Sequence, residues 1–391
     1  MIFDENLYRI SLNPPRFCYT DHATPLDQAK IGLRIVLVER LKTMMKRTSK
    51  VLALALAVAT ASTLSVVGVT AAHADASKTA CVILPDENAG SRWEPGDHPA
   101  LDAILTGAGF TTNFQNAKND PTQYVTLGDQ MLATGCGVMI LTDLNGAGAT
   151  VATKAKAQGI PVIAYDRPIA NADYYISFDN NLVGQLEAQT VINGLKAAGK
   201  NPKTASVVCG KGDPTDGNAA MFWGGSATVL AKAGVKCAFT LKGTWDAPTE
   251  GTEFEQAYTA LKGKIDGVVA PNDANANAII TILNKNHQKV AIGGQDSGQV
   301  GLSNVLLGYQ TATVYKPFHA EAKLAASTAI ALLNGQKPAY TKTNNGVPFI
   351  FAQPILVGPT GVEQVVKNGD ITTAALCVGP VAAACTKYGV K

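Results

Sequence analysis

The chain has 391 residues, of which 46% are hydrophobic and 16% are charged. This is an ordinary globular composition, with enough apolar material for more than one core. The formal charge is only +3, and residues 1–74 hold 9 of the 33 Lys and Arg but 5 of the 30 Asp and Glu. The rest of the chain is therefore nearly neutral, which argues against a nucleic acid or an anionic membrane surface as the partner.

The amino-terminal part has the pattern of an export signal. A basic segment at 44–50 precedes a long stretch rich in Ala, Val and Leu, and a small-x-small tripeptide follows at 72–74. We predict a signal peptide over residues 44–74 and interpret residues 1–43 as an extension from a wrongly chosen upstream start codon. A membrane anchor is the alternative, because the apolar stretch is long. Its small residues and the cleavage pattern favour an exported, soluble protein, periplasmic or extracellular.

Cysteine usage agrees with export, because an even number of cysteines in an oxidising compartment predicts disulfides. The six that follow the signal are Cys81, Cys136, Cys209, Cys237, Cys377 and Cys385. The last two flank a Gly-Pro turn, so a local link is the simplest expectation. The first two lie at the start of predicted strands and would meet at one end of a parallel sheet. The middle two would pair by default, although they fall at different heights on their strands, and the pairing stays open.

From residue 79 onward, strands alternate with helices. The first unit has expected strands at 81–84, 111–115, 138–142, 162–165 and 175–177, and expected helices at 99–107, 121–134 and 149–158. The second unit has expected helices at 181–198, 218–233, 253–262 and 274–284, and expected strands at 205–209, 237–241, 267–270, 290–293 and 305–309. A long helix at 317–334, an extended segment at 349–356 and a short tail follow. The rhythm predicts an α/β protein with two similar lobes, each a doubly wound parallel sheet with helices on both faces.

The segment 160–168 illustrates how the sequence marks a binding edge. Its apolar first half predicts a buried strand, which ends in Asp166 and Arg167, and Pro168 prevents further pairing. A carboxylate and a guanidinium group are therefore presented at the carboxyl end of a strand, where open α/β sheets bind ligands. A salt bridge between these two side chains is the alternative interpretation.

Other predicted strands end in the same way. The polar or indole side chains that follow them are Ser91, Arg92, Trp93, Glu94, Asp213, Asp216, Asn218, Trp245, Asp246, Asn272, Asp273, Gln295, Asp296, Tyr315 and Lys316. This mixture suits a neutral, hydroxyl-rich ligand, because each hydroxyl both donates and accepts and the C–H face of a sugar packs on an indole. Each residue also has a plainer interpretation: Asn272 could cap the next helix, the tryptophans could belong to the core, and Lys316 could be a surface charge. Asp213 and Asp216 are interpreted as turn residues.

Several segments, in order along the chain, resemble the periplasmic sugar-binding proteins of ABC importers, and most closely the D-xylose-binding proteins. They are Arg92-Trp93, Ala164-Tyr165-Asp166-Arg167, 175–180, 268–270 with Asn272-Asp273, Gly294-Gln295-Asp296, 313–317 and 344–346. The resemblance implies the type I periplasmic binding fold, in which two Rossmann-like lobes are joined by three hinge segments, here near 178–180, 310–312 and 349–351. The implied amino-terminal lobe is 78–179 plus 313–348, and the implied carboxyl-terminal lobe is 180–310 plus 351–391.

The resemblance also implies a function. A monomer without a cofactor would capture a monosaccharide, D-xylose foremost, between the lobes and deliver it to an ABC permease, without being an enzyme. The implied ligand-binding residues are Arg92, Trp93, Asp166, Arg167, Asn218, Trp245, Asn272, Asp296 and Lys316.

Two departures from the family's pattern leave the identity of the sugar open. Gly217 stands where the family has an Asn, and the segment after Trp245 lacks a second tryptophan. Three alternatives therefore stay in view. The first is another monosaccharide such as glucose, and the second is a sensory binding protein for a chemoreceptor or sensor kinase. The most remote is a glycoside-active enzyme that uses Asp166 and Asp296 as an acid pair.

Overall fold

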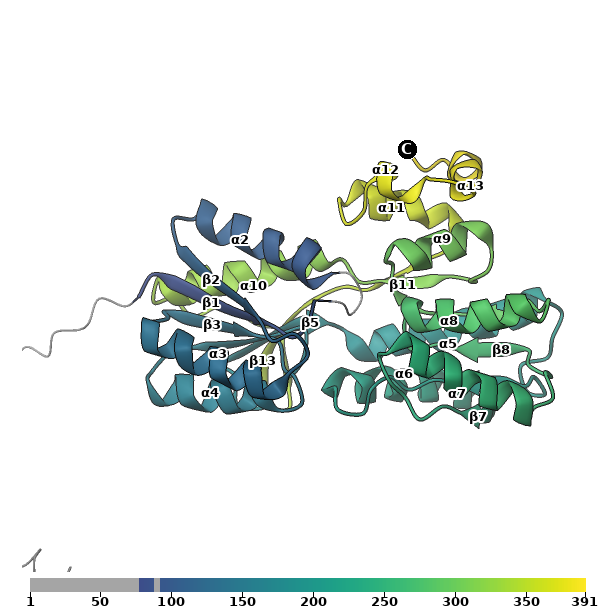
Figure 1. The fold of residues 1–391 in the computed structure, drawn as a ribbon, viewed down its shortest axis with the longest axis horizontal. Coiled ribbons are helices and arrows are strands. Elements are labelled where there is room, and N and C mark those ends of the chain that lie inside the picture. The colour runs from purple at the N-terminus through teal and green to yellow at the C-terminus, as the bar shows by residue number, and fades with distance from the viewer. Residues whose placement is uncertain (1–76, 88–91) are drawn as a thin grey trace, which may run out of the picture. The chain divides into compact units, whose positions relative to one another are not determined.

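The computed structural model describes residues 77–87 and 92–391. The predicted signal peptide and the upstream extension lie outside these residues. Within this part of the chain two parallel sheets, each covered by helices on both faces, form two lobes (Figure 1). The predicted α/β class and the two-lobed arrangement are confirmed. None of the helices in the described ranges combines the length and the apolar character needed to cross a bilayer.

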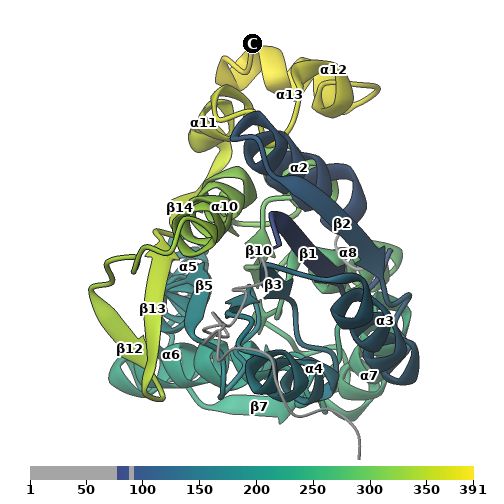
Figure 2. The same cartoon turned by 90° about the vertical axis from the view of Figure 1, so that its left-hand side faces the viewer.

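A seven-stranded sheet forms the first lobe, in the order β12-β13-β5-β4-β3-β1-β2. The strands are β1 (Thr79–Leu84), β2 (Thr111–Asn116), β3 (Val138–Leu141), β4 (Val162–Tyr165), β5 (Tyr174–Phe178), β12 (Lys342–Asn344) and β13 (Val347–Ala352). Neighbours are parallel except β12 and β13. Helices α2 (His98–Gly107) and α10 (Phe318–Leu333) cover one face, and α3 (Pro121–Thr134) and α4 (Ala147–Ala157) cover the other (Figure 2).

The alternation of side chains along β1 explains this layering. Cys81 and Ile83 pack with the cluster under α3 and α4, whereas Ala80 and Val82 pack with the cluster under α2 and α10. All four are fully buried. A strand that is apolar on both faces is what a parallel sheet covered by two helical layers requires.

The second lobe contains a parallel four-stranded sheet in the order β7-β6-β8-β9. Its strands are β6 (Val207–Cys209), β7 (Cys237–Thr240), β8 (Gly267–Val269) and β9 (Ala291–Ile292). Helices α5 (Asn180–Ala197) and α6 (Gly217–Ala233) pack on one face, and α7 (Ala247–Ala260) and α8 (Asp273–Lys285) pack on the other. A small sheet of β10 (Gln295–Asp296), β11 (Thr313–Tyr315) and β14 (Ile355–Val357) adjoins it.

The end of the second lobe differs from the sequence-based expectation. Residues 305–309, predicted as a strand, belong to helix α9 (Gln299–Leu307) and the turn after it. The expected short tail forms η3 (Pro359–Gly361), α11 (Val362–Lys367), α12 (Thr373–Leu376) and α13 (Val381–Tyr388). These helices share one hydrophobic cluster with α9 and β11. Helix α7 also begins earlier than expected, at Ala247, because the side chain of Asp246 caps it.

Strand pairing also bears on the lobe boundaries. Residues 313–315 pair with β10 and β14 and so lie with the second lobe, and residues 351–352 still pair with β5 of the first. These two boundaries therefore fall a few residues later than expected, and the rest of the division stays a prediction. Disulfides join Cys81 to Cys136, Cys209 to Cys237 and Cys377 to Cys385, a pairing that the sequence had left open. A register shift between β6 and β7 accommodates the second of them.

Helices α5 and α6 approach closely because glycines face each other's backbone. A Cβ on Gly184 would overlap the carbonyl group of Phe222, and a Cβ on Gly225 would overlap that of Asn181. We expect Gly184→Ala to lower the free energy of unfolding by about 1–3 kcal/mol, since the two helices must move apart. Urea denaturation measures this. Gly224→Ala is the control, because a Cβ there meets its nearest neighbour at an ordinary 3.7 Å, and equal effects of both changes would contradict the close packing.

Candidate functional site

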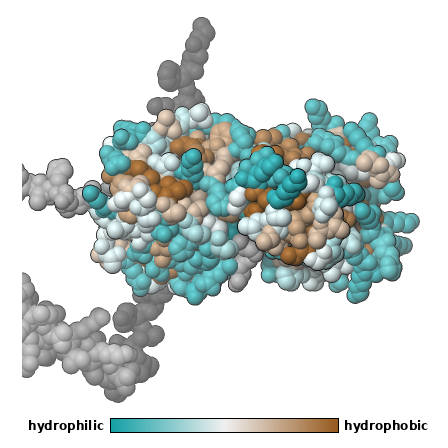
Figure 3. Space-filling model, turned by 90° about the horizontal axis from the view of Figure 1, so that it is seen from above, coloured by the Kyte–Doolittle hydropathy of each residue, from teal (hydrophilic) through white to brown (hydrophobic). Residues whose placement is uncertain are grey.

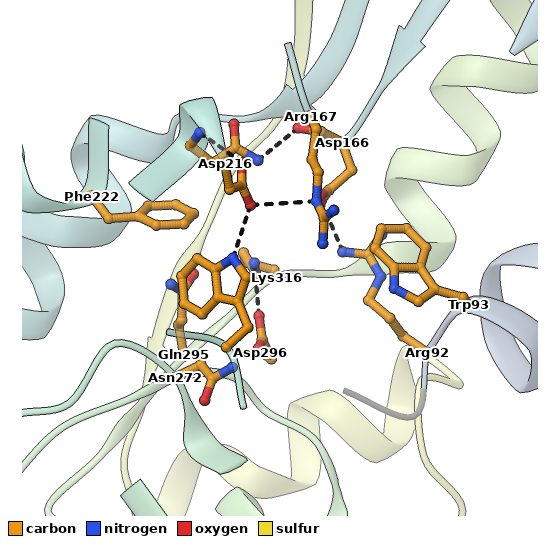
Figure 4. Close-up of a pocket in the computed structure, with 12 residues that line it drawn as sticks. Arg92, Trp93, Asp166, Arg167, Asp216, Phe222, Asn272, Gln295, Asp296 and Lys316 are labelled. Carbon is orange, nitrogen blue, oxygen red and sulfur yellow. Dashed lines mark hydrogen bonds and ion pairs between the residues drawn. The ribbon is translucent and has the colours of Figure 1, made fainter. Parts of the chain in front are cut away.

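All nine residues predicted to bind ligand line one pocket between the lobes (Figure 4). Arg92, Trp93, Asp166 and Arg167 come from the first lobe. Asn218, Trp245, Asn272 and Asp296 come from the second, and Lys316 lies on the segment between β11 and α10. The pocket is also lined by Asp216, Phe222 and Gln295, none of which was among the predicted residues.

Arg92 is held by carboxylates on three sides. It precedes the π-helical turn η2 (Trp93–Asp97), and Asp97 accepts from its Nε at 2.9 Å and from its Nη2 at 2.7 Å. Nη2 also donates to Glu321 of α10 at 2.6 Å, and Nη1 donates to Asp166 at 3.0 Å. These bonds use every N–H of the guanidinium group except one on Nη1. Arg92 is therefore fixed in place and keeps one donor for a ligand.

Burial and the neighbouring charges shift the pKa values of this cluster in opposite directions. Burial would lower the pKa of Arg92, but Asp97, Asp166 and Glu321 raise it well above its ordinary value. Burial raises the pKa of Asp97 and of Glu321, and Arg92 offsets part of each rise. Burial would also raise the pKa of Asp166, but Arg92, Lys316 and Arg167 together lower it below its usual range. Asp166 therefore faces the pocket as a carboxylate.

Asp166 occupies the left-handed region, with φ of 60°. Its backbone N–H donates to the carbonyl of Ile176 at 2.8 Å, and its own carbonyl oxygen accepts from Ser177 and Asn218 at 2.8 and 2.9 Å. Such a network stabilises a conformation that a non-glycine residue rarely adopts. The unusual backbone directs the side chain toward Arg92. The salt bridge with Arg167 that the sequence suggested is replaced by these other pairings.

Arg167 and Asn218 both reach across to the opposite lobe. Arg167 Nε lies 3.3 Å from a carboxylate oxygen of Asp216, at the start of α6. Asn218 accepts from Tyr175 at 2.8 Å and from Asn180 at 2.9 Å, and it donates to the carbonyl of Asp166 at 2.9 Å. Asn218 lines the pocket, but most of its hydrogen-bonding capacity joins the lobes. Asn218 therefore lies where the sequence predicts a ligand-binding residue, but its hydrogen bonds to Tyr175 and Asp166 indicate that it also connects the two lobes.

The two tryptophans and Phe222 provide the apolar walls. Trp93 is 4% exposed and packs in the core of the first lobe, with the guanidinium of Arg92 4.4 Å from its ring centre. Trp245 meets Phe222 edge to face, at 6.3 Å between ring centres, and donates from Nε1 to Asp216 at 3.2 Å. Asp216 also accepts from the backbone N–H of Asn218, so it is both the predicted turn residue and part of the pocket. Burial raises its pKa, partly offset by Arg167.

The remaining polar groups come from the second lobe. Asn272 caps α8 by accepting from the Asn275 N–H at 2.8 Å, which leaves its amide NH₂ for the pocket. Gln295 donates to Pro271 at 2.7 Å, and its Oε1 is buried with no hydrogen-bond partner. Asp296 pairs with Lys316 at 2.7 Å. Burial would lower the pKa of Lys316, but Asp296 and Asp166 raise it above its usual value.

The charges of the pocket balance. Three carboxylates (Asp166, Asp216, Asp296) face three cations (Arg92, Arg167, Lys316). A site with equal charges, amides and aromatic walls suits a neutral ligand with many hydroxyl groups, because each hydroxyl finds both a donor and an acceptor. A glycosidase acid must hold a proton near neutral pH, whereas Arg92, Lys316 and Arg167 keep the pKa of Asp166 low. Asp166 is therefore poorly suited to act as such an acid.

Known proteins are similar to this chain in sequence. A family model described as a periplasmic binding protein domain matches residues 82–337. The D-xylose-binding periplasmic protein of Escherichia coli (strain K12) is 34% identical over 314 residues, which cover 76% of this chain and 92% of that protein. The multiple sugar-binding periplasmic receptor ChvE of Rhizobium radiobacter is 29% identical over 324 residues, which cover 74% of this chain and 90% of that protein.

Solved structures are similar in fold. An ABC transporter solute binding protein from Clostridium phytofermentans, with bound β-D-glucose, has a TM-score of 0.69 at 24% identity and covers 76% of this chain and 99% of that one. A carbohydrate transporter solute binding protein from Chloroflexus aurantiacus, in complex with D-glucose, has a TM-score of 0.67 at 23% identity and covers 76% and 98%. At these identities the structures support the fold alone.

Proposed function

We proceed from the family to which this chain belongs, the periplasmic sugar-binding proteins of ABC transporters, and we propose that it captures one neutral monosaccharide, D-xylose foremost, in the pocket between its lobes. The relatives are binding proteins of transport systems and not enzymes, and so is this chain. The observation that carries the proposal is the pocket itself. It gathers balanced charges, amides and aromatic rings from both lobes.

The choice of sugar rests on the relatives. The E. coli protein that is 34% identical to this chain over 314 residues is named for D-xylose, which favours that sugar. Other relatives are named for multiple sugars, so D-glucose, the alternative that the sequence left open, stays the second candidate ligand. A missing partner for a buried polar group is costly, so the site would discriminate among sugars by their hydroxyl patterns.

The proposed mechanism is closure of the lobes around the sugar. Donors and acceptors on opposite lobes, such as Arg167 and Asp296, bond to one ligand only when the lobes are close together. A sugar that makes these bonds shifts the population toward the closed state. The closed form would then deliver the sugar to a membrane permease. We expect the protein to be exported by the signal at 44–74 and to act outside the cytoplasm.

The surface agrees with a protein that acts as a monomer. Seen from above, hydrophilic side chains interrupt the hydrophobic ones on both lobes (Figure 3). Among the described residues, the exposed large hydrophobic side chains are Val300, Tyr309, Tyr340, Ile355 and Val378. Subunit interfaces usually present a larger continuous apolar patch.

Thermal melts with D-xylose, D-glucose, D-ribose, L-arabinose and D-galactose test the proposed function. A sugar at about 100 times its dissociation constant is expected to add roughly 2.7 kcal/mol to the free energy of unfolding, which raises the melting temperature. Xylitol is the control, because it carries the hydroxyl groups of the pentose on an open, flexible chain. The proposal fails if no sugar shifts the melt, or if xylitol shifts it as much as D-xylose does.

Sugar sensing is the second candidate function, because one relative is named as a receptor. Purified permease and chemoreceptor from the same organism would separate the two functions. Sugar-dependent binding to the permease supports transport, and sugar-dependent binding to the receptor supports sensing.

A further inference from the structure

Asp273 is a buried carboxylate that does not line the pocket but bonds to the segments around it. It is the first residue of α8, next to Asn272, and it is 2% exposed. Its Oδ2 accepts from the backbone N–H of Ser297 at 2.8 Å and from the hydroxyl of Thr313 at 2.9 Å. Its Oδ1 accepts from Nε2 of Gln310 at 2.7 Å. One side chain thus joins the start of α8 to two other segments, one at Ser297 and one at residues 310–313.

The segment that Asp273 holds at Ser297 has an unusual backbone. Asp296 and Ser297 have φ values of 97° and 58°, so two consecutive non-glycine residues occupy the left-handed half of φ space. Such conformations persist only where the surroundings determine them. The bond from Ser297 N–H to Asp273 supplies that constraint, and it lies directly beside Asp296, whose carboxylate faces the pocket.

The other two partners lie on the segment that leads to Lys316. Gln310 precedes β11, Thr313 is its first residue, and Lys316 follows its last. Residues 310–312 are also the predicted hinge segment. Asp273 therefore connects the Asp296 turn to the chain that carries the cationic partner of Asp296. Burial, and then the charge of Asp296, raises the pKa of Asp273 to about 7, as expected for a carboxylate held where solvent cannot stabilise it.

Two glycines leave the space that this carboxylate fills. A Cβ on Gly301, inside α9, would overlap the carboxylate of Asp273, and a Cβ on Gly294 would lie 2.5 Å from Oδ1. Gly301 has an ordinary helical backbone, where alanine is normally the better residue. The carboxylate of Asp273, and not the helix, therefore explains why residue 301 is a glycine.

We propose that Asp273 is a positioning residue that fixes the turn presenting Asp296 to the sugar and ties this turn to the segment 310–313. Its effect on sugar affinity rests on the proposed function, whereas the link between the two segments does not. Asp273 itself touches no sugar. It holds the turn that carries Asp296 at a fixed position relative to the segment that carries Lys316. The two members of this ion pair therefore move together when the lobes close.

Hydrogen exchange of the ligand-free protein tests the link. We expect peptides covering 294–300 and 308–316 to exchange about tenfold faster in Asp273→Asn than in wild type, because the amide cannot accept all three bonds. Gly301→Ala should give the same result by displacing the carboxylate, although alanine strengthens the helix. Asp120→Asn is the matched control: Asp120 also accepts backbone N–H bonds at a helix start, but in the first lobe and outside the pocket.

Sugar affinity provides the second readout. We expect Asp273→Asn to weaken binding about tenfold in the wild-type background and to add no further loss in an Asp296→Asn background, because the two residues act through one turn. Unchanged exchange in either segment, or equal losses in both backgrounds, would overturn the inference. A wild-type protein that binds no monosaccharide, with the exchange result intact, would instead refute the proposed function and leave the link supported.

Discussion

Asp296→Ala and Arg167→Ala are each expected to reduce sugar affinity at least about 100-fold, while the ligand-free protein still unfolds in one cooperative transition. Asp296 offers an acceptor from the second lobe, and its loss leaves the buried cation of Lys316 without its 2.7 Å partner. Arg167 offers a fork of donors from the first lobe. Either loss leaves sugar hydroxyls unpaired in a dry pocket. Titration calorimetry and thermal unfolding followed by circular dichroism measure the two quantities.

The surface pair between Asp129 and Lys154 is a matched control for this prediction. It has the same 2.7 Å separation as the pair of Asp296 and Lys316, but both side chains are at least 40% exposed. Asp129→Ala should leave sugar affinity unchanged and cost less than about 1 kcal/mol of stability. Wild-type affinity in both Asp296→Ala and Arg167→Ala would show that the pocket is not the binding site.

The largest effect on stability is expected for Arg92→Met. The change leaves three carboxylates, those of Asp97, Asp166 and Glu321, without the cation that they surround. Removing one partner from a buried ion pair typically costs about 3–5 kcal/mol. Arg167→Met should cost much less, because Arg167 faces a single carboxylate, that of Asp216. Urea unfolding of both variants at pH 8 gives the comparison.

The free energy of unfolding of Arg92→Met should also depend on pH. Burial already raises the pKa of Asp97 and Glu321, and removing Arg92 raises both further. A carboxyl whose folded pKa lies above its unfolded pKa binds protons preferentially in the folded state, so stability increases as the pH falls through the folded value. Arg92→Met should therefore recover part of its loss between pH 8 and pH 5. Equal stability of the two methionine variants at pH 8, or no recovery at lower pH, would contradict this account of the cluster.

Much of the fold could be predicted from the sequence, because parallel strands that are buried on both faces give continuous apolar runs. Residues 162–165 end in a charged pair at the edge of the sheet, and the structure places strand β4 at these residues. Helix α3 likewise has the bounds 121–134 that its amphipathic pattern predicts. In both cases local pattern and tertiary position agree, which is when sequence reasoning succeeds.

Helix α9 shows where such reasoning fails. Val305, Leu306 and Leu307 form a short apolar run, which predicts a strand as readily as a buried helix. The helical spacing of Leu302, Val305 and Leu306 was present in the sequence, and these residues pack against β11 and the tail. Gly308, in the left-handed conformation with φ of 72°, ends the helix. The tail helices that complete this cluster come from residues far along the chain, and local pattern gave no sign of the contact.

The sequence predicted which residues line the candidate site, but not which of them also connect the lobes or position other side chains. Strand ends identified a larger set of polar side chains, and the family resemblance selected the nine residues from it. Gln295 belonged to the strand-end set but was not selected, whereas Phe222 lies within α6 and gave no signal. The tethering bonds of Asn218 and the buried bonds of Asp273 depend on contacts between distant segments. Only the folded structure reveals such roles.

A crystal structure of the protein with D-xylose would test the central claim most directly. The account predicts one sugar ring in the pocket, close to Trp93 or Trp245, with hydrogen bonds to Arg167 on the first lobe and Asp296 on the second. A sugar bound outside the pocket, or held by one lobe alone with the lobes apart, would contradict it.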